Sequence, residues 1–187
     1  MNKKLAAALT GGAALVLTLT GCGDDGADTA AWAKKVCDKV KPQVDKIQQA
    51  NKSINEASQQ KKSPEEVQKI DSAAFQDISE AYKALADAVD DAGIPPVENG
   101  EKLETNAVDE LKGLSKSYAG LKKTVDELDT GDQSEFAEGL KGLAQELGRL
   151  GESGDKSLQK LQSGELGQAM SEQEGCRKAS PGSTPTT

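Results

Sequence analysis

Apolar side chains recur at intervals of three and four residues along four long stretches of this 187-residue chain. This spacing places them on one face of an α-helix, and no stretch alternates with the period of two that indicates a strand. The third stretch is the most regular, because its intervals of four and three run unbroken from Ala107 to Leu128. Such a heptad pattern is typical of a packing seam between helices. The sequence therefore predicts an all-α fold.

Turn and capping signals divide these stretches into separate helices. The clearest start lies at residues 63–66, where Ser63 can cap a helix, Pro64 supplies the first helical φ angle and Glu66 can bond back to the cap. The expected elements are a first helix over about 29–60, a second from 63 to a turn at 93–96, a third ending near a turn at 129–132, a fourth from 132, and a short final helix over 165–174. Long helices joined by short turns favour an antiparallel up-down four-helix bundle over residues 31–176.

Glycines interrupt the third and fourth helical stretches, where each costs about 1 kcal/mol relative to alanine. Two explanations are open at this point. The glycines allow close approach or bending of the helices, or they mark a mobile half of the bundle that opens to admit a partner helix or an apolar ligand. The residues concerned are Gly113, Gly120, Gly139, Gly142, Gly148, Gly151 and Gly154.

The C-terminal end of the chain has a composition unlike the rest. Residues 180–187 consist only of Ser, Thr, Pro and Gly. Such a segment cannot bury enough apolar surface to order itself. We therefore expect residues 177–187 to form a disordered tail, with glycosylation as an alternative use of its hydroxyl groups.

The first 22 residues have the organisation of an export signal. Lys3 and Lys4 form a basic start, a mainly apolar run follows over 5–19, and small residues precede Cys22. The run is shorter than the roughly 20 residues that cross a membrane as a helix. Its end, Leu19-Thr20-Gly21-Cys22, resembles the lipobox of bacterial lipoproteins. The chain is also similar in architecture to small helical secreted lipoproteins of actinobacteria and other Gram-positive bacteria.

This resemblance implies a route of export and attachment. A signal peptide over residues 1–21 would be cleaved, Cys22 would be diacylated, and the protein would be anchored to the extracytoplasmic face of the cell membrane. Residues 22–30 would form a flexible tether. Two acyl chains give lasting attachment where one does not. The alternative is an ordinary cleaved signal in which Cys22 has no role.

Two cysteines, Cys37 and Cys176, remain once Cys22 is assigned to lipid. They lie near opposite ends of the mature domain, in a compartment where disulfides persist, so we expect them to be bonded. In an up-down bundle the start of the first helix and the end of the fourth lie at the same end. The disulfide would then clamp the membrane-proximal base, and the turns near Gln60 and Asp129 would form an outward tip. Two free thiols are the alternative.

The charge of the mature chain restricts its partners. Loss of Lys3 and Lys4 leaves 21 basic against 31 acidic residues, a formal charge of about −10. Binding of phosphates requires clustered Lys and Arg, whereas the basic residues here are dispersed among acids. The sequence therefore argues against nucleic acid and anionic lipid headgroups as partners.

Catalytic and metal-binding signals are weak. The chain contains no histidine, the usual general base and the commonest metal ligand. It also lacks a GxSxG elbow, a P-loop and a GxGxxG motif after a strand. An acidic turn over 129–135 is a weak calcium candidate whose spacing does not match an EF-hand. Paired carboxylates beside lysines are interpreted as solvated faces: Glu65 with Glu66, Asp87 with Asp90 and Asp91, and Glu135 with Glu138. We therefore expect no enzyme activity, no cofactor and no metal site.

Two functions fit these observations. The first is a lipid-anchored cell-surface helical protein that acts as a non-catalytic interaction or structural module. It would be a monomer that presents its tip or a groove to another envelope protein. The alternative is an extracytoplasmic lipoprotein that binds a small apolar ligand in a cavity between the glycine-rich helices. An exposed groove would favour the first function, and an enclosed cavity would favour the second.

Overall fold

The computed structural model describes residues 24–161 and 163–177 of the chain. The predicted signal peptide over 1–21, the predicted lipid-attachment residue Cys22 and residues 178–187 of the predicted tail lie outside this part. The predictions made for those segments therefore remain predictions.

Six helices and no strand make up the described part of the chain, so the predicted all-α class is confirmed. The short final helix expected over 165–174 is present as two pieces, with a break at Gln173. The helices are α1 (Asp24–Gln59), α2 (Pro64–Ala92), α3 (Gly100–Asp126), α4 (Gln133–Leu161), α5 (Gly164–Glu172) and α6 (Glu174–Arg177).

Helix α2 begins and ends where the sequence indicates. The backbone N–H of Glu66 donates to Ser63 Oγ at 3.3 Å, and the Ser63 N–H donates to the Glu66 carboxylate at 3.1 Å. This completes the predicted capping box. The helix stops before Gly93, whose φ of +79° lies in a region that favours glycine.

Residues 24–30 belong to α1, so the prediction of a flexible tether is wrong for them. The loop between α2 and α3 holds this part of the helix. Thr29 is buried and its hydroxyl donates to the carbonyl oxygen of Pro96 at 3.3 Å. The indole N–H of Trp32 donates to the carbonyl oxygen of Gly93 at 2.7 Å. The small and acidic composition of the segment suggested a tether, because composition does not reveal contacts with distant residues.

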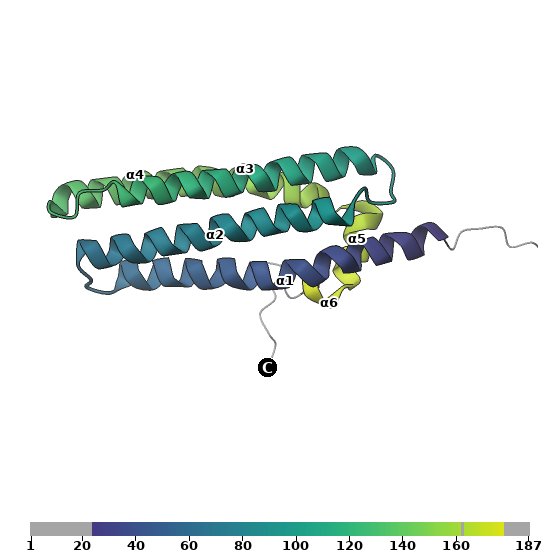
Figure 1. Ribbon diagram of the computed structural model, residues 1–187, viewed down its shortest axis with the longest axis horizontal. Coiled ribbons are helices and arrows are strands. Elements are labelled where there is room, and N and C mark those ends of the chain that lie inside the picture. Colours follow the sequence, from purple (N-terminus) through teal and green to yellow (C-terminus); the bar gives the residue numbers. More distant parts are fainter. Residues whose placement is uncertain (1–23, 162, 178–187) are drawn as a thin grey trace, which may run out of the picture.

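Helix α2 lies between α1 and α3, which are its most extensive neighbours, and α4 packs mainly on α3 (Figure 1). The α1–α2 connection and the α3–α4 connection lie at one end of the molecule, which we call the tip. The α2–α3 connection lies at the opposite end, which we call the base, as does the N-terminal end of α1. Within the described residues, α1 and α4 share no extensive contact. The core is therefore centred on α2.

The seam predicted for the third helix lies in this core. Its central aromatic residue, Tyr118, stacks on Tyr82 with ring centroids 5.5 Å apart and is tilted against Phe75 at 6.3 Å. Five members of the seam are buried and two are half-buried, which confirms its inward orientation. The buried members are Ala107, Leu111, Leu114, Leu121 and Val125, and the half-buried ones are Tyr118 and Leu128.

Cys37 and Cys176 form the predicted disulfide, which joins α1 to α6 across a sequence separation of 139 residues. Their Cα atoms lie 5.1 Å apart. Helices α5 and α6 both pack on α1, and Leu166 of α5 is buried in the same cluster as Trp32 and Val36. The C-terminal helices thus cover the part of α1 that is nearer the base.

Close helix approach does not explain several glycines of α3 and α4. A Cβ built on any of four of them would meet no atom within 4 Å: Gly113, Gly120, Gly142 and Gly148. At Gly139 it would lie 2.3 Å from Cδ2 of Leu128, the far end of a flexible side chain. The surroundings of Gly151 and Gly154 lie outside the described side chains.

Candidate functional site

A pocket of about 360 Å³ lies near the tip, between α1, α2 and α4. Its volume falls within the range of roughly 300–1,000 Å³ that small-molecule sites occupy. The space is left because α4 packs on α3 without an extensive contact with α1 among the described residues. From α1 and the turn after it come Ile54, Ala57, Ser58 and Gln60, from α2 come Val67, Asp71 and Phe75, and from α4 come Leu140, Leu143, Ala144 and Leu147.

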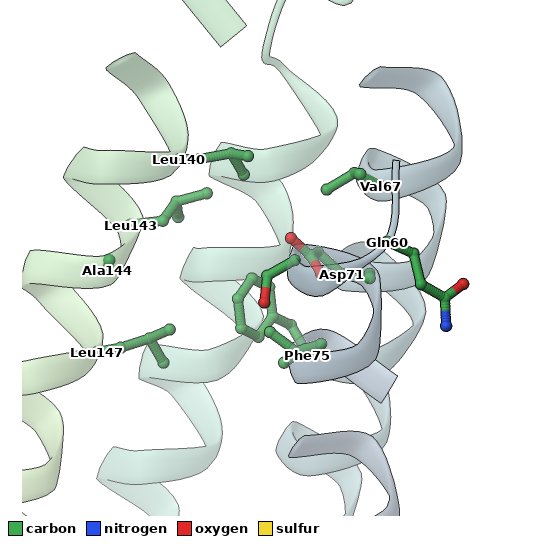
Figure 2. A pocket seen from close by; sticks show the side chains of 11 residues that line it. Gln60, Val67, Asp71, Phe75, Leu140, Leu143, Ala144 and Leu147 are labelled. Atoms are coloured by element: carbon green, nitrogen blue, oxygen red, sulfur yellow. The ribbon is translucent and has the colours of Figure 1, made fainter. Parts of the chain in front are cut away.

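The walls of the pocket are mainly apolar. Leu143 and Phe75 are buried, and Leu140 and Leu147 are half-buried. The three leucines are spaced three and four residues apart, so they share one face of α4. Figure 2 shows this face directed across the pocket toward α2. An apolar molecule would bury surface here at a gain of about 25 cal/mol per Å².

Asp71 is the one ionisable residue in this lining. Only 7% of its surface is exposed, and its Oδ1 atom has no hydrogen-bond partner in the described part of the chain. Burial raises the pKa of its carboxyl group to about 6. In Figure 2 the carboxyl group points from α2 toward the α4 side of the pocket. An unpaired buried acceptor costs about 1–3 kcal/mol, so the pocket contains an unsatisfied acid.

The other polar groups near Asp71 are directed elsewhere. The hydroxyl of Ser58 donates to a backbone carbonyl of α1 at 2.7 Å. Gln60 is exposed, and Figure 2 shows its amide group directed away from Asp71. Gln68, nearly one turn before Asp71 on α2, donates its amide to carbonyl oxygens at the end of α3, two of them at 2.9 Å. The donor that would satisfy Asp71 is therefore missing from the lining.

Asp71 was not among the carboxylates singled out from the sequence, although a signal was present. It interrupts an apolar stripe of α2 whose neighbouring members are Val67, Ala74 and Ile78. A carboxylate at such a register is carried into the interior with the stripe, and buried acids without a partner are rare. The position of Asp71 on the apolar face of the helix indicated its burial, whereas a search for paired acids could not find it.

The carboxylates that were singled out lie outside the pocket. Asp87 pairs with Lys83 at 2.7 Å, and Asp90 lies 3.9 Å from Lys112. Glu65, Glu66, Asp91, Glu135 and Glu138 are exposed. Exposed ion pairs of this kind contribute about 0–1 kcal/mol. These groups form solvated helix faces, as the sequence indicates.

The acidic turn at the tip is used to build the start of α4. Oδ1 of Asp129 accepts the N–H of Gly131 at 2.8 Å. Oδ1 of Asp132 accepts the N–H groups of Ser134 and Glu135 at 2.8 and 3.0 Å, so Asp132 caps the predicted start of α4. Among the described residues, no group of three or more His, Cys, Asp or Glu side chains could hold a metal ion.

The pocket and the disulfide lie far apart along α1. From Cys37 to Ala57 the helix rises about 30 Å, at 1.5 Å per residue. The disulfide therefore cannot touch a ligand in the pocket. None of the helices in the described part of the chain is long and apolar enough to cross a membrane.

No family model matches the chain, and neither the curated proteins nor the solved structures include a match. No ligand, partner or site can therefore be transferred from a relative. The function has to be inferred from the pocket and from the N-terminal sequence.

Proposed function

We propose that this protein is a lipid-anchored, extracytoplasmic and non-catalytic protein that binds a small apolar molecule in the pocket near the tip. The pocket is half open, so it lies between an exposed groove and an enclosed cavity. Its mainly apolar lining and a volume typical of ligand sites carry the proposal. Ligand binding, the alternative in the sequence interpretation, is thereby preferred to the interaction module. No feature of similar specificity in the described residues favours a protein partner.

The arrangement of the helices supports entry of a ligand. We infer that α1 to α4 form an antiparallel up-down bundle that is open between α1 and α4. Support comes from the reversal of direction at each connection in Figure 1 and from extensive contacts of α2 with both α1 and α3. The contact of α4 with α3 is smaller. A shift of α4 would therefore change the width of the pocket, and Leu143 would move against Phe75 of α2 and Leu121 of α3.

The anchor is proposed on the sequence Leu19-Thr20-Gly21-Cys22. Since α1 begins at Asp24, only Gly23 would separate the lipidated cysteine from the helix. Ala57, at the pocket, would then lie about 50 Å along the helix from the anchor, at 1.5 Å per residue. Such a position would allow the pocket to exchange ligand at a distance from the membrane surface.

Ligand binding can be tested with N-phenyl-1-naphthylamine, a dye whose emission rises in apolar sites. The test uses the mature chain with Cys22→Ala, which retains every described residue. Ala144→Phe fills the pocket from an exposed position of α4, and Ala119→Phe is the matched control at an exposed position of α3 outside the lining. We expect saturable binding by the parent and the control, and its loss in Ala144→Phe. Equal binding by all three chains, or by none, would contradict the proposal.

Anchoring needs a separate test in cells. The native sequence should incorporate labelled palmitate and remain with the membrane fraction, and Cys22→Ala should do neither. Crosslinking from intact cells then separates the two functions. Recovery of one specific protein partner, with no bound small molecule, would restore the interaction module as the better account.

A further inference from the structure

We propose that the ligand of the tip pocket is an amphiphilic amine, whose apolar body lies against Phe75, Leu143 and Leu147 and whose ammonium group binds the carboxylate of Asp71. The inference rests on the proposed ligand-binding function and adds the chemical class of the ligand. It begins from Oδ1 of Asp71, which is buried and without a hydrogen-bond partner in the described part of the chain.

The described side chains around Asp71 do not supply the missing donor. Ser58 and Gln68 already donate to backbone carbonyl oxygens, and the amide of Gln60 is directed away from the pocket. Leu143 and Leu147, which line the pocket from α4, carry no polar atoms in their side chains. A ligand that brings a donor to this place removes the cost of an unpaired buried acceptor.

The charge of the pocket selects among possible donors. No Lys or Arg belongs to the lining, and the residues that α1 and α4 contribute to it are neutral, so Asp71 sets the local charge. At neutral pH most Asp71 carboxyl groups are ionised, since the raised pKa remains below 7. An ammonium group then forms a charge-assisted hydrogen bond, about twice as strong as one between neutral groups. A fatty acid would instead bring a second carboxylate, which is repelled.

The other residues that line the pocket indicate what the apolar part of the ligand is. Ile54 and Ala57 of α1 line the pocket together with Phe75 of α2 and the leucines of α4. A single aliphatic chain or a small ring system satisfies this surface, whereas a sugar or a nucleotide would leave its hydroxyl or phosphate groups without partners. The two requirements together describe a cationic amphiphile.

Competition against the bound dye tests the ligand class. Octylamine, octan-1-ol and octanoate have the same apolar chain and differ only in the head group. At about pH 7.5 the amine is protonated, and we expect it to displace the dye at a concentration roughly 10- to 100-fold lower than the alcohol. Octanoate should be the weakest competitor. Equal competition by the three molecules would overturn the amine but leave the proposed function intact, whereas failure of the dye to bind would overturn both.

Variants of Asp71 test whether its carboxylate causes the preference for octylamine over octan-1-ol. Asp71→Asn should bind the dye and lose the advantage of octylamine over octan-1-ol. Asp71→Leu, whose side chain suits the apolar surroundings, should behave in the same way. The matched control is Asp77→Asn, which removes a half-exposed carboxylate of α2 that pairs with Lys46 at 3.2 Å outside the pocket. The control should keep the preference. Retention of the preference in both Asp71 variants would overturn the proposal.

Discussion

Gly175 meets the backbone of Cys37 so closely that no side chain fits between them. A Cβ built on Gly175 would lie 2.1 Å from the carbonyl oxygen of Cys37 and 2.7 Å from its carbonyl carbon. Both are backbone atoms, so neither can rotate away. Because Cys176 follows directly, this approach of α6 to α1 is what brings its sulfur atom within bonding reach of Cys37.

Gly175→Ala should therefore weaken the clamp at the base. The added methyl group forces α6 away from α1, and overpacking of this kind costs about 1–3 kcal/mol. We expect the variant to be less stable than the parent and its disulfide to be reduced at a lower concentration of dithiothreitol. Gly120→Ala is the control, since a Cβ there meets no atom within 4 Å. Identical reduction profiles for Gly175→Ala and the parent would exclude this role.

Reduction of the disulfide should act mainly on α5 and α6. The bond closes a loop of 139 residues, and loss of such a bond lowers the free energy of unfolding by roughly 2–5 kcal/mol. The C-terminal helices pack chiefly on α1, whereas α1, α2 and α3 have extensive contacts of their own. Limited proteolysis of the reduced chain should cut first after residue 161. First cleavage between α1 and α2 would contradict this prediction.

The exposed glycines of α4 should be replaceable with a gain in stability. Gly142 and Gly148 are exposed and have open space around the position of a Cβ. Alanine at each position should raise the free energy of unfolding by about 0.5–1 kcal/mol, because glycine loses more backbone freedom on folding. Urea denaturation measures the gain, and amide exchange in α4 should slow with it. A loss of stability would show that the helix needs these glycines for bending.

Local signals were enough to predict much of the fold. The Ser63 and Asp132 caps, the turn at Gly93 and the seam of α3 depend on residues within one or two turns of each other, so their chemistry is visible in the sequence. The disulfide was also predictable, because only two cysteines remain after Cys22 is assigned to lipid.

Features that depend on distant residues could not be predicted in the same way. Residues 24–30 are helical against the loop between α2 and α3, and their composition alone suggested a tether. The pocket arises because α1 and α4 share no extensive contact among the described residues, which no helical pattern reveals. Asp71 lies between these cases, because its register predicted burial but only the fold identifies the apolar neighbours that leave it without a donor.

Asp71 should make the stability of the fold depend on pH. Its pKa is raised from the ordinary value of 3.8 to about 6, so the folded protein binds this proton more tightly than the unfolded chain. Ionisation of the buried carboxyl group lowers the free energy of unfolding. This loss is absent below about pH 4, grows as the pH rises to about 6 and is constant above, at about 3 kcal/mol. The stability advantage of Asp71→Asn over the parent in urea denaturation should therefore increase from about pH 4.5 to 6 and stay constant up to about pH 7.5. A stability difference that does not change with pH would contradict the burial of the charge.

The most direct test of the account is an NMR titration of the Asp71 carboxyl carbon, with its resonance assigned by Asp71→Asn. In the free protein we predict a midpoint near pH 6, as burial requires. Saturation with octylamine should lower this midpoint, because a bound ammonium group favours the ionised carboxylate, and octan-1-ol should lower it less. A free-protein midpoint near 3.8, or a midpoint that octylamine leaves unchanged, would contradict the assignment of Asp71 as the partner of the ligand.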